Sequence, residues 1–251
     1  MNPHRHGRVV WRELMIRDEA RARAFYGALL GWTYEETDLA PGEHYTLFTL
    51  EGELVGGMRQ LGLDKTTPPR WLSYVSVPDV EGVAKLAVAQ GGKLVRGPMD
   101  IQNFGRCVVM QDFAGALIAA VQESQEEPAL EPPRVGEFCW ESVGTPNVER
   151  AKDFYGKLFG WKTAKGPEGV VARFSTNGGA QGHVADVLES KQFSPAWIPH
   201  VRVEKMGPLM DRVSELGGEV EAVFSVARVA RIAIIRDPEG GGLSLYEPTS
   251  R

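Results

Sequence analysis

Residues 18–32 read DEARARAFYGALLGW, and residues 147–161 read NVERAKDFYGKLFGW. Both stretches contain Phe-Tyr-Gly followed by Gly-Trp, and each residue of the second lies 129 positions after its counterpart. In each stretch a capping residue, Asp18 or Asn147, precedes apolar residues at helical spacing, and a glycine follows them. The chain therefore contains the same aromatic helix twice.

The repeat extends on both sides of these helices. Further matching landmarks are Trp11 and Trp140, Trp71 and Trp197, Gly91-Gly92 and Gly217-Gly218, and Asp112 and Asp237. The offset between partners falls only from 129 to 126 and then to 125. An offset that shrinks in small steps indicates one unit copied twice, with short loop deletions in the second copy.

A linker separates the two copies. Residues 123–134, ESQEEPALEPPR, are rich in glutamate and proline, a composition typical of an extended connection. We therefore predict a first domain over residues 1–122, a linker over 123–134 and a second domain over 135–251. Each domain is long enough to bury a core of its own.

The hydrophobic period predicts the order strand, helix, strand, strand, strand, four times over. In the first half the predicted strands are 9–16, 32–36, 45–50, 54–59, 71–77, 93–97, 106–111 and 116–122, with helices after Asp18 and over 80–89. Glu51-Gly52 and, in the second half, Asn177-Gly178 are predicted as tight hairpin turns. The fold class is α+β.

These motifs resemble the vicinal oxygen chelate superfamily, which includes glyoxalase I, bleomycin-resistance proteins and extradiol dioxygenases. The segment D-x5-A-F-Y-G-x-L-L-G-W (18–32) resembles the first helix of that family, and G-R-x4-Q-D-x2-G (105–115) resembles its closing hairpin. The resemblance covers residues 8–122 and 136–248. It implies two tandem domains, each a pair of βαβββ modules that form an open U-shaped sheet, or cup, around a ligand or metal.

Metal-dependent members of the superfamily carry His, Gln or Glu ligands on the first, fifth and last strands of a domain. The corresponding positions are Trp11, Leu72 and Ala119 in the first half, and Trp140, Ile198 and Ser244 in the second. None of these side chains is a good ligand for a divalent ion. The sequence therefore predicts no cofactor, and a divalent metal held by displaced ligands is the alternative.

Six residues are candidates for ligand binding: Trp11, Glu13, Tyr74, Trp140, Ser142 and His200. The two tryptophans begin strands and form aromatic walls or plug the cup. Glu13 lies two residues after Trp11 on the same strand face, and Ser142 is its counterpart in the second half. Tyr74 and His200 occupy equivalent places on the fifth strands. Glu13 and His200 are also the candidates for acid–base catalysis.

Composition narrows the classes of partner. The net charge is −5, without a basic stripe for nucleic acid, and no segment resembles a membrane span or signal peptide. Two cysteines do not make a disulfide framework, so a cytoplasmic protein, monomeric or homodimeric, is expected.

The main functional hypothesis is a protein that binds a small organic molecule in an aromatic-lined cup without the metal triad. The alternatives are a metal-dependent lyase or dioxygenase with displaced ligands, a metal-free acid–base enzyme, and an interaction module with plugged cups.

Overall fold

A computed structural model describes residues 5–40, 42–62, 67–125, 131–167, 170–176, 183–189, 194–226 and 229–249. The predicted turn at Asn177-Gly178 lies outside the described residues. The same holds for residues 126–130 of the predicted linker.

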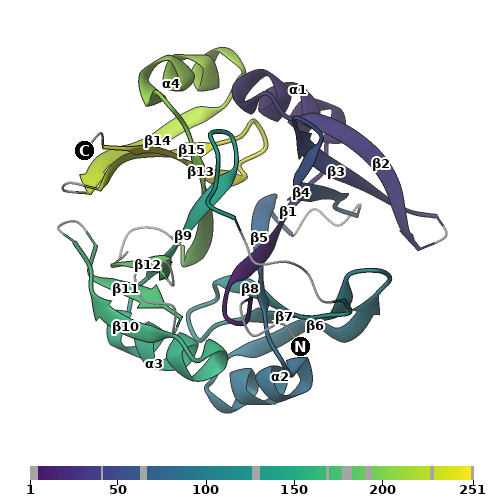
Figure 1. The fold of residues 1–251 in the computed structure, drawn as a ribbon, viewed down its shortest axis with the longest axis vertical. Coiled ribbons are helices and arrows are strands. Elements are labelled where there is room, and N and C mark those ends of the chain that lie inside the picture. The colour runs from purple at the N-terminus through teal and green to yellow at the C-terminus, as the bar shows by residue number, and fades with distance from the viewer. Residues whose placement is uncertain are drawn as a thin grey trace. The chain divides into compact units, whose positions relative to one another are not determined.

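The predicted order of elements is confirmed within the described residues (Figure 1). The first half contains β1 (Val9–Ile16), α1 (Glu19–Leu30), β2 (Thr33–Ala40), β3 (Glu43–Leu50), β4 (Glu53–Gln60), β5 (Arg70–Ser76), α2 (Val80–Ala89), β6 (Lys93–Ile101), β7 (Gly105–Gln111) and β8 (Leu117–Glu123). The second half contains β9 (Phe138–Thr145), α3 (Val148–Phe159), β10 (Lys162–Lys165), β11 (Ala172–Ser175), β12 (His183–Glu189), β13 (Ala196–Arg202), α4 (Met206–Glu215), β14 (Glu219–Val226), β15 (Ala230–Arg236) and β16 (Gly242–Pro248).

Each half of the sequence contributes one eight-stranded sheet. The strand orders are β2-β3-β4-β1-β5-β8-β7-β6 and β10-β11-β12-β9-β13-β16-β15-β14. The two orders match strand for strand, which confirms the internal repeat and the α+β class.

Local sequence signals set the helix ends and the tight turn. The Asp18 carboxylate accepts a hydrogen bond from the Arg21 N–H, and Gly31 ends α1 with a left-handed backbone at φ 75°. Glu51 and Gly52 both have positive φ, as the first hairpin turn requires.

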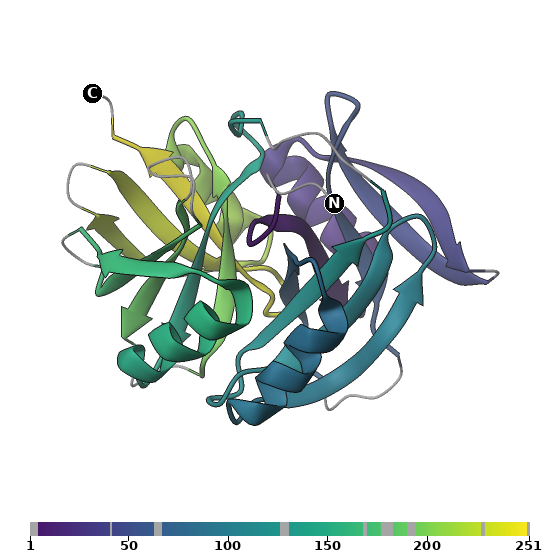
Figure 2. The same ribbon diagram turned by 60° about the horizontal axis from the view of Figure 1, so that its bottom comes forward.

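The chain forms two compact units that both draw on the two halves of the sequence. Unit 1 comprises Met1–Val10, Ser73–Glu131 and Glu141–Trp197, and unit 2 comprises Trp11–Leu72, Pro132–Trp140 and Ile198–Arg251. In unit 1 helix α2 packs beside α3, and in unit 2 helix α1 packs beside α4 (Figures 1 and 2).

The repeated aromatic residues explain why modules from different halves pack together. In unit 2 the Trp71 Nε1–H donates to the Tyr26 hydroxyl at 3.0 Å, which donates to Asp237 Oδ2 at 2.8 Å. The same chain of bonds in unit 1 consists of Trp197, Tyr155 and Asp112.

Each hydrophobic cluster likewise contains residues from both halves, rather than the separate core per half that length alone suggests. The difference arises because the aromatic helix of one half finds its buried partner on the closing hairpin of the other.

Within the part of the chain that the structure describes, no helix has both the length and the apolar composition needed to cross a bilayer.

Candidate functional site

The strands have one face packed against the helices and an opposite face, here called the inner face. On β1, Leu14 and Ile16 belong to the hydrophobic core with α1, so Glu13, which directly precedes Leu14, points to the inner face. On β13, Val201 belongs to the same core, so His200 points to the inner face. The candidates Glu13 and His200 are therefore on the face opposite the helices.

Glu13 lies in a polar network on β1, β3 and β4 of unit 2. It is 5% exposed, and its Oε1 lies 3.6 Å from Arg59 Nε. The Tyr45 hydroxyl accepts a hydrogen bond from Trp11 Nε1 at 2.9 Å and is also hydrogen-bonded to Glu13. Burial raises the pKa of Tyr45 well above its ordinary value, and the Glu13 charge adds to the rise. Trp11 and Glu13 are thus brought together through Tyr45.

Gly57 provides the space for this network. It lies directly opposite Glu13 in the parallel β1–β4 pair, and a Cβ at this position would overlap the Tyr45 ring. The ring therefore covers the inner face beside Glu13. Arg59 also donates to Glu43 at 2.6 Å, so one guanidinium serves two carboxylates. Most of the polar groups near Glu13 are already engaged with one another.

His200 and Ser244 form a different arrangement on β13 and β16, also in unit 2. The two residues lie directly opposite each other in the parallel pair, and they are 1% and 0% exposed. Burial lowers the pKa of His200 to about 3, so its imidazole is neutral at pH 7. The Ser244 hydroxyl is buried with no hydrogen-bond partner among the described residues. A buried hydroxyl in that state costs free energy unless another molecule satisfies it.

Aromatic side chains accompany this pair. The Tyr246 ring centroid lies 6.3 Å from that of His200, in an edge-to-face arrangement. Strand β9 runs next to β13, where the Cys139 Sγ–H donates to the His200 carbonyl at 3.5 Å, and the partly buried Trp140 follows Cys139. Neutral polar groups and aromatic rings are therefore combined on one stretch of sheet.

The remaining candidates, Tyr74 and Ser142, belong to unit 1. Tyr74 is 3% exposed, and its ring packs edge-to-face on Phe104 with centroids 5.6 Å apart. Ser142 is 2% exposed and lies opposite Asp186 on β12. Asp186 forms a bidentate ion pair with Arg173, in which Arg173 Nε donates to Oδ1 at 2.6 Å and a terminal guanidinium nitrogen donates to Oδ2 at 3.0 Å.

Sequence reasoning missed Tyr45, Arg59, Asp186 and Arg173. Arg59, Asp186 and Arg173 each lie one residue from a core residue on the same strand, and Tyr45 lies three residues before the core residue Phe48. That alternation places such side chains on the inner face, but only the strand register tells which residues they meet.

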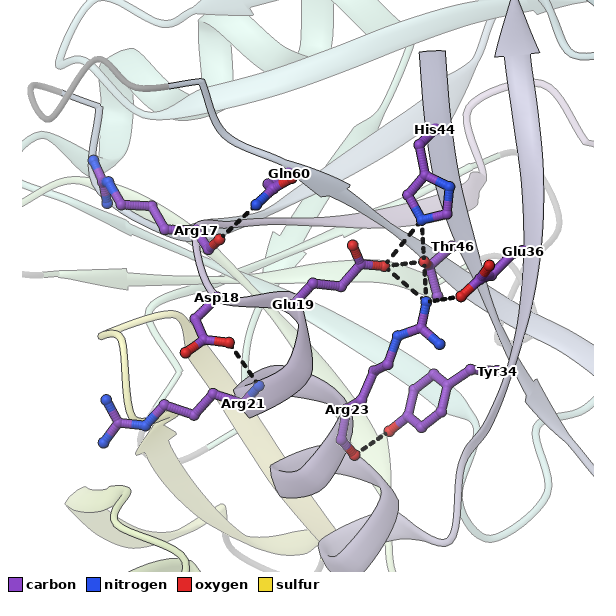
Figure 3. Close-up of polar contacts among 10 residues, drawn as sticks. All are labelled: Arg17, Asp18, Glu19, Arg21, Arg23, Tyr34, Glu36, His44, Thr46 and Gln60. Atoms are coloured by element: carbon purple, nitrogen blue, oxygen red, sulfur yellow. Dashed lines mark hydrogen bonds and ion pairs between the residues drawn. The ribbon is translucent and has the colours of Figure 1, made fainter. Parts of the chain in front are cut away.

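A second polar cluster lies where α1 meets β2 and β3 in unit 2 (Figure 3). The Arg23 guanidinium donates to Glu19, Glu36 and Thr46 at 2.9–3.0 Å. Thr46 also donates to Glu19, and His44 Nε2 lies 3.6 Å from that carboxylate. Burial alone would raise the pKa of Glu19, but the hydrogen bonds from Thr46 and Arg23 hold it below its ordinary value. Because these groups satisfy one another, the cluster holds the β2–β3 hairpin against α1.

The family resemblance implies a metal, so the projected ligand positions need to be tested against the structure. Trp11 Nε1 is engaged with Tyr45, while Leu72 and Ala119 are buried and apolar. Ser244 supplies a single neutral oxygen next to the His200 imidazole. Over the described ranges, no group of three or more His, Cys, Asp or Glu side chains is placed to hold a metal ion.

Comparison with known proteins gives relatives along the whole chain. No model of a known protein family matches. The chain is 25% identical to "Putative glyoxylase CFP32" of Mycobacterium tuberculosis, over 98% of this chain and 96% of the relative. It is 28% identical to the anthracycline biosynthesis protein DnrV of Streptomyces peucetius, over 96% and 93%.

Solved structures share the fold at lower identity. The 2,3-dioxygenase LapB from Pseudomonas sp. KL28 matches with a TM-score of 0.63 and 14% identity, over 97% of this chain and 92% of that chain. The Mn(II)-bound glyoxalase from Novosphingobium aromaticivorans matches with a TM-score of 0.62 and 14% identity, over 97% and 82%. With its four βαβββ modules in two matching sheets, the chain has the fold of these dioxygenase and glyoxalase structures, and along its length it is similar to a relative named as a putative glyoxylase.

Proposed function

We propose that the chain binds a flat aromatic small molecule on the inner face of β9, β13 and β16, without a catalytic metal ion. The observation that carries this proposal is the Ser244 hydroxyl, fully buried and without a hydrogen-bond partner among the described residues. It lies beside the neutral His200 imidazole, while Tyr246 on the same strand and Trp140 on the strand next to β13 supply aromatic surface. Ligand sites are typically apolar and aromatic, with a few polar groups that fix orientation.

The available donors do not fit a metal centre. Ser244 and His200 offer one neutral hydroxyl and one imidazole, whereas a catalytic divalent ion ordinarily has three protein ligands. The neutral state of His200 suits hydrogen bonding to an uncharged ligand better than proton transfer, because a base with a pKa of about 3 is weak at pH 7.

The relatives suggest the ligand class. DnrV and DauV are named for anthracycline biosynthesis, and both match along nearly their whole length. Anthracyclines are flat polycyclic quinones with carbonyl and hydroxyl oxygens. We infer that such a molecule packs its rings against aromatic side chains and presents an oxygen to Ser244 and His200.

Ser244→Ala tests this function, because the variant moves stability and affinity in opposite directions. Removing an unsatisfied buried hydroxyl should raise the free energy of unfolding by about 1 kcal/mol, and losing a ligand hydrogen bond should weaken anthracycline binding about tenfold. Urea unfolding and a fluorescence titration measure the two quantities.

Ser76→Ala is the matched control for stability. Its hydroxyl donates to Glu123 at 2.6 Å, so this variant should be destabilised instead. A Ser244→Ala protein that gains stability and keeps its affinity would overturn the proposal, because the hydroxyl would then be only a packing defect.

A further inference from the structure

Arg202 on β13 places a cation on the inner face of unit 2. Its two neighbours in sequence belong to the hydrophobic core of this unit, Val201 and Val203, so the Arg202 side chain points to the opposite face. It follows His200 by two residues, which span about 6.6 Å along a strand. In the parallel β13–β16 pair, Arg202 lies directly opposite Tyr246. The guanidinium therefore belongs to the same stretch of sheet as the proposed ligand site.

The positive charge of Arg202 has no carboxylate partner among the described residues. The terminal nitrogen Nη1 donates to the Pro133 carbonyl at 3.0 Å, and that acceptor is neutral. The Nε atom is buried and has no hydrogen-bond partner over the same part of the chain. A buried donor on a charged group costs more free energy than a neutral one when it lacks an acceptor. An anion on the inner face would satisfy both the charge and the Nε–H group.

The first half has a serine and a carboxylate at the corresponding positions. Arg202 follows Ser76 by 126 residues, and the Ser76 hydroxyl donates to Glu123 at 2.6 Å. Glu123 is the last residue of β8, and Pro248 is the last residue of the equivalent strand β16. The second half therefore has a cation in place of the serine and a proline in place of the carboxylate.

The remaining donors of the guanidinium suit a carboxylate. Because Pro133 accepts from Nη1, the Nε–H and Nη2–H groups on the other edge of the planar group are left for a ligand. These two parallel donors match the two oxygens of a carboxylate. Further along the same strands, the Ser244 hydroxyl and the neutral His200 imidazole suit an uncharged oxygen. The site thus offers a charged end and a neutral end.

We propose that the ligand of the inner-face site in unit 2 carries a carboxylate, which Arg202 binds through Nε and Nη2. This inference rests on the proposed function, since it assigns a charge to the ligand of that same site. The aromatic rings lie between the carboxylate at Arg202 and a carbonyl or hydroxyl oxygen at Ser244. A ligand with an ammonium group in place of the carboxylate is rejected, because it would bring a second positive charge against Arg202.

Anthraquinone-2-carboxylate and anthraquinone-2-carboxamide test the charge of the ligand, because they share the rings and the quinone oxygens and differ in one group. Titration of each into the full chain, followed by tryptophan fluorescence, should show the carboxylate binding about tenfold more tightly. Arg202→Gln should weaken carboxylate binding about tenfold and change carboxamide binding by less than about twofold. Arg231→Gln is the matched control, since it removes a cation of the same unit that is 47% exposed, and it should leave both affinities unchanged.

A measurement on the wild-type protein keeps the test decisive if Arg202→Gln does not fold. Raising the salt concentration should weaken binding of the carboxylate and leave binding of the carboxamide nearly unchanged. Equal affinities for the two probes, or a preference for the carboxylate that persists in a folded Arg202→Gln protein, would overturn this inference and leave the proposed function standing. Binding of neither probe would overturn both.

Discussion

Tyr26→Phe is expected to lower the free energy of unfolding by about 2–4 kcal/mol, because it leaves two buried polar groups without their partner. The Tyr26 side chain is fully buried, and its hydroxyl joins Trp71 Nε1 to Asp237 Oδ2. Without that hydroxyl, the indole N–H loses its acceptor and the carboxylate loses a donor. Burial already raises the pKa of Asp237, and the bond from Tyr26 partly offsets that rise.

Urea unfolding monitored by circular dichroism measures the loss, with Tyr34→Phe as the matched control. The Tyr34 hydroxyl donates to the Arg23 carbonyl at 2.6 Å in a partly buried position, where water can replace it. The control should therefore lose only about 1 kcal/mol. Equal losses in the two variants would contradict the role assigned to the Trp71–Tyr26–Asp237 chain.

Lowering the pH is expected to reduce the free energy of unfolding, because His200 is buried in the folded protein and exposed in the unfolded chain. An exposed histidine would not have this effect. In the folded protein burial lowers the pKa of His200 to about 3, whereas in the unfolded chain it is about 6.5. Below pH 6.5 the unfolded state therefore binds a proton that the folded state does not. The contribution of His200 to stability is fully present above pH 6.5 and falls by about 1.4 kcal/mol per pH unit as the pH drops towards 3.

The comparison of wild type with His200→Leu isolates this contribution. Urea unfolding at pH 7, 6, 5 and 4.5 should show a shallower decline in the variant. Identical slopes in wild type and His200→Leu would show that His200 does not stay neutral in the folded protein.

Local sequence signals predicted the elements because their causes are local. Asp18, Gly31 and the Glu51-Gly52 turn act within a few residues of themselves, and the structure has them as predicted. The nearly constant offset of the repeat extended the predicted order of helices and strands to the second half, and it supported the resemblance to the superfamily.

The sequence did not predict how the modules pack against one another, because the packing contacts join residues that are far apart in the chain. Tyr26 and Asp237 are 211 residues apart, and Trp32 Nε1 donates to the Gly136 carbonyl across 104 residues. Sequence alone marked these residues as repeated and structural, but it did not say which copy supplies each partner.

The candidate site was predictable only in part, for the same reason. Strand alternation is sufficient to place Glu13 on the inner face with Trp11. The sequence does not show that the Tyr45 ring covers Gly57. That contact depends on the parallel pairing of β1 with β4, which puts Gly57 opposite Glu13. The two halves also place their inner-face carboxylates on different strands. Glu13 lies on β1 opposite Gly57, whereas in the second half Asp186 lies on β12 opposite Ser142, and only the strand pairing shows this difference.

Titration of an anthracycline into protein stripped of metal by chelation tests the central claim most directly. The metal-free account predicts the same affinity, within about twofold, before and after chelation and after addition of Mn(II), Fe(II), Ni(II) or Zn(II), because hydrogen bonds and aromatic contacts supply the binding. Loss of binding on chelation, with recovery when one of these ions is returned, would contradict the account and indicate a metal centre built from displaced ligands.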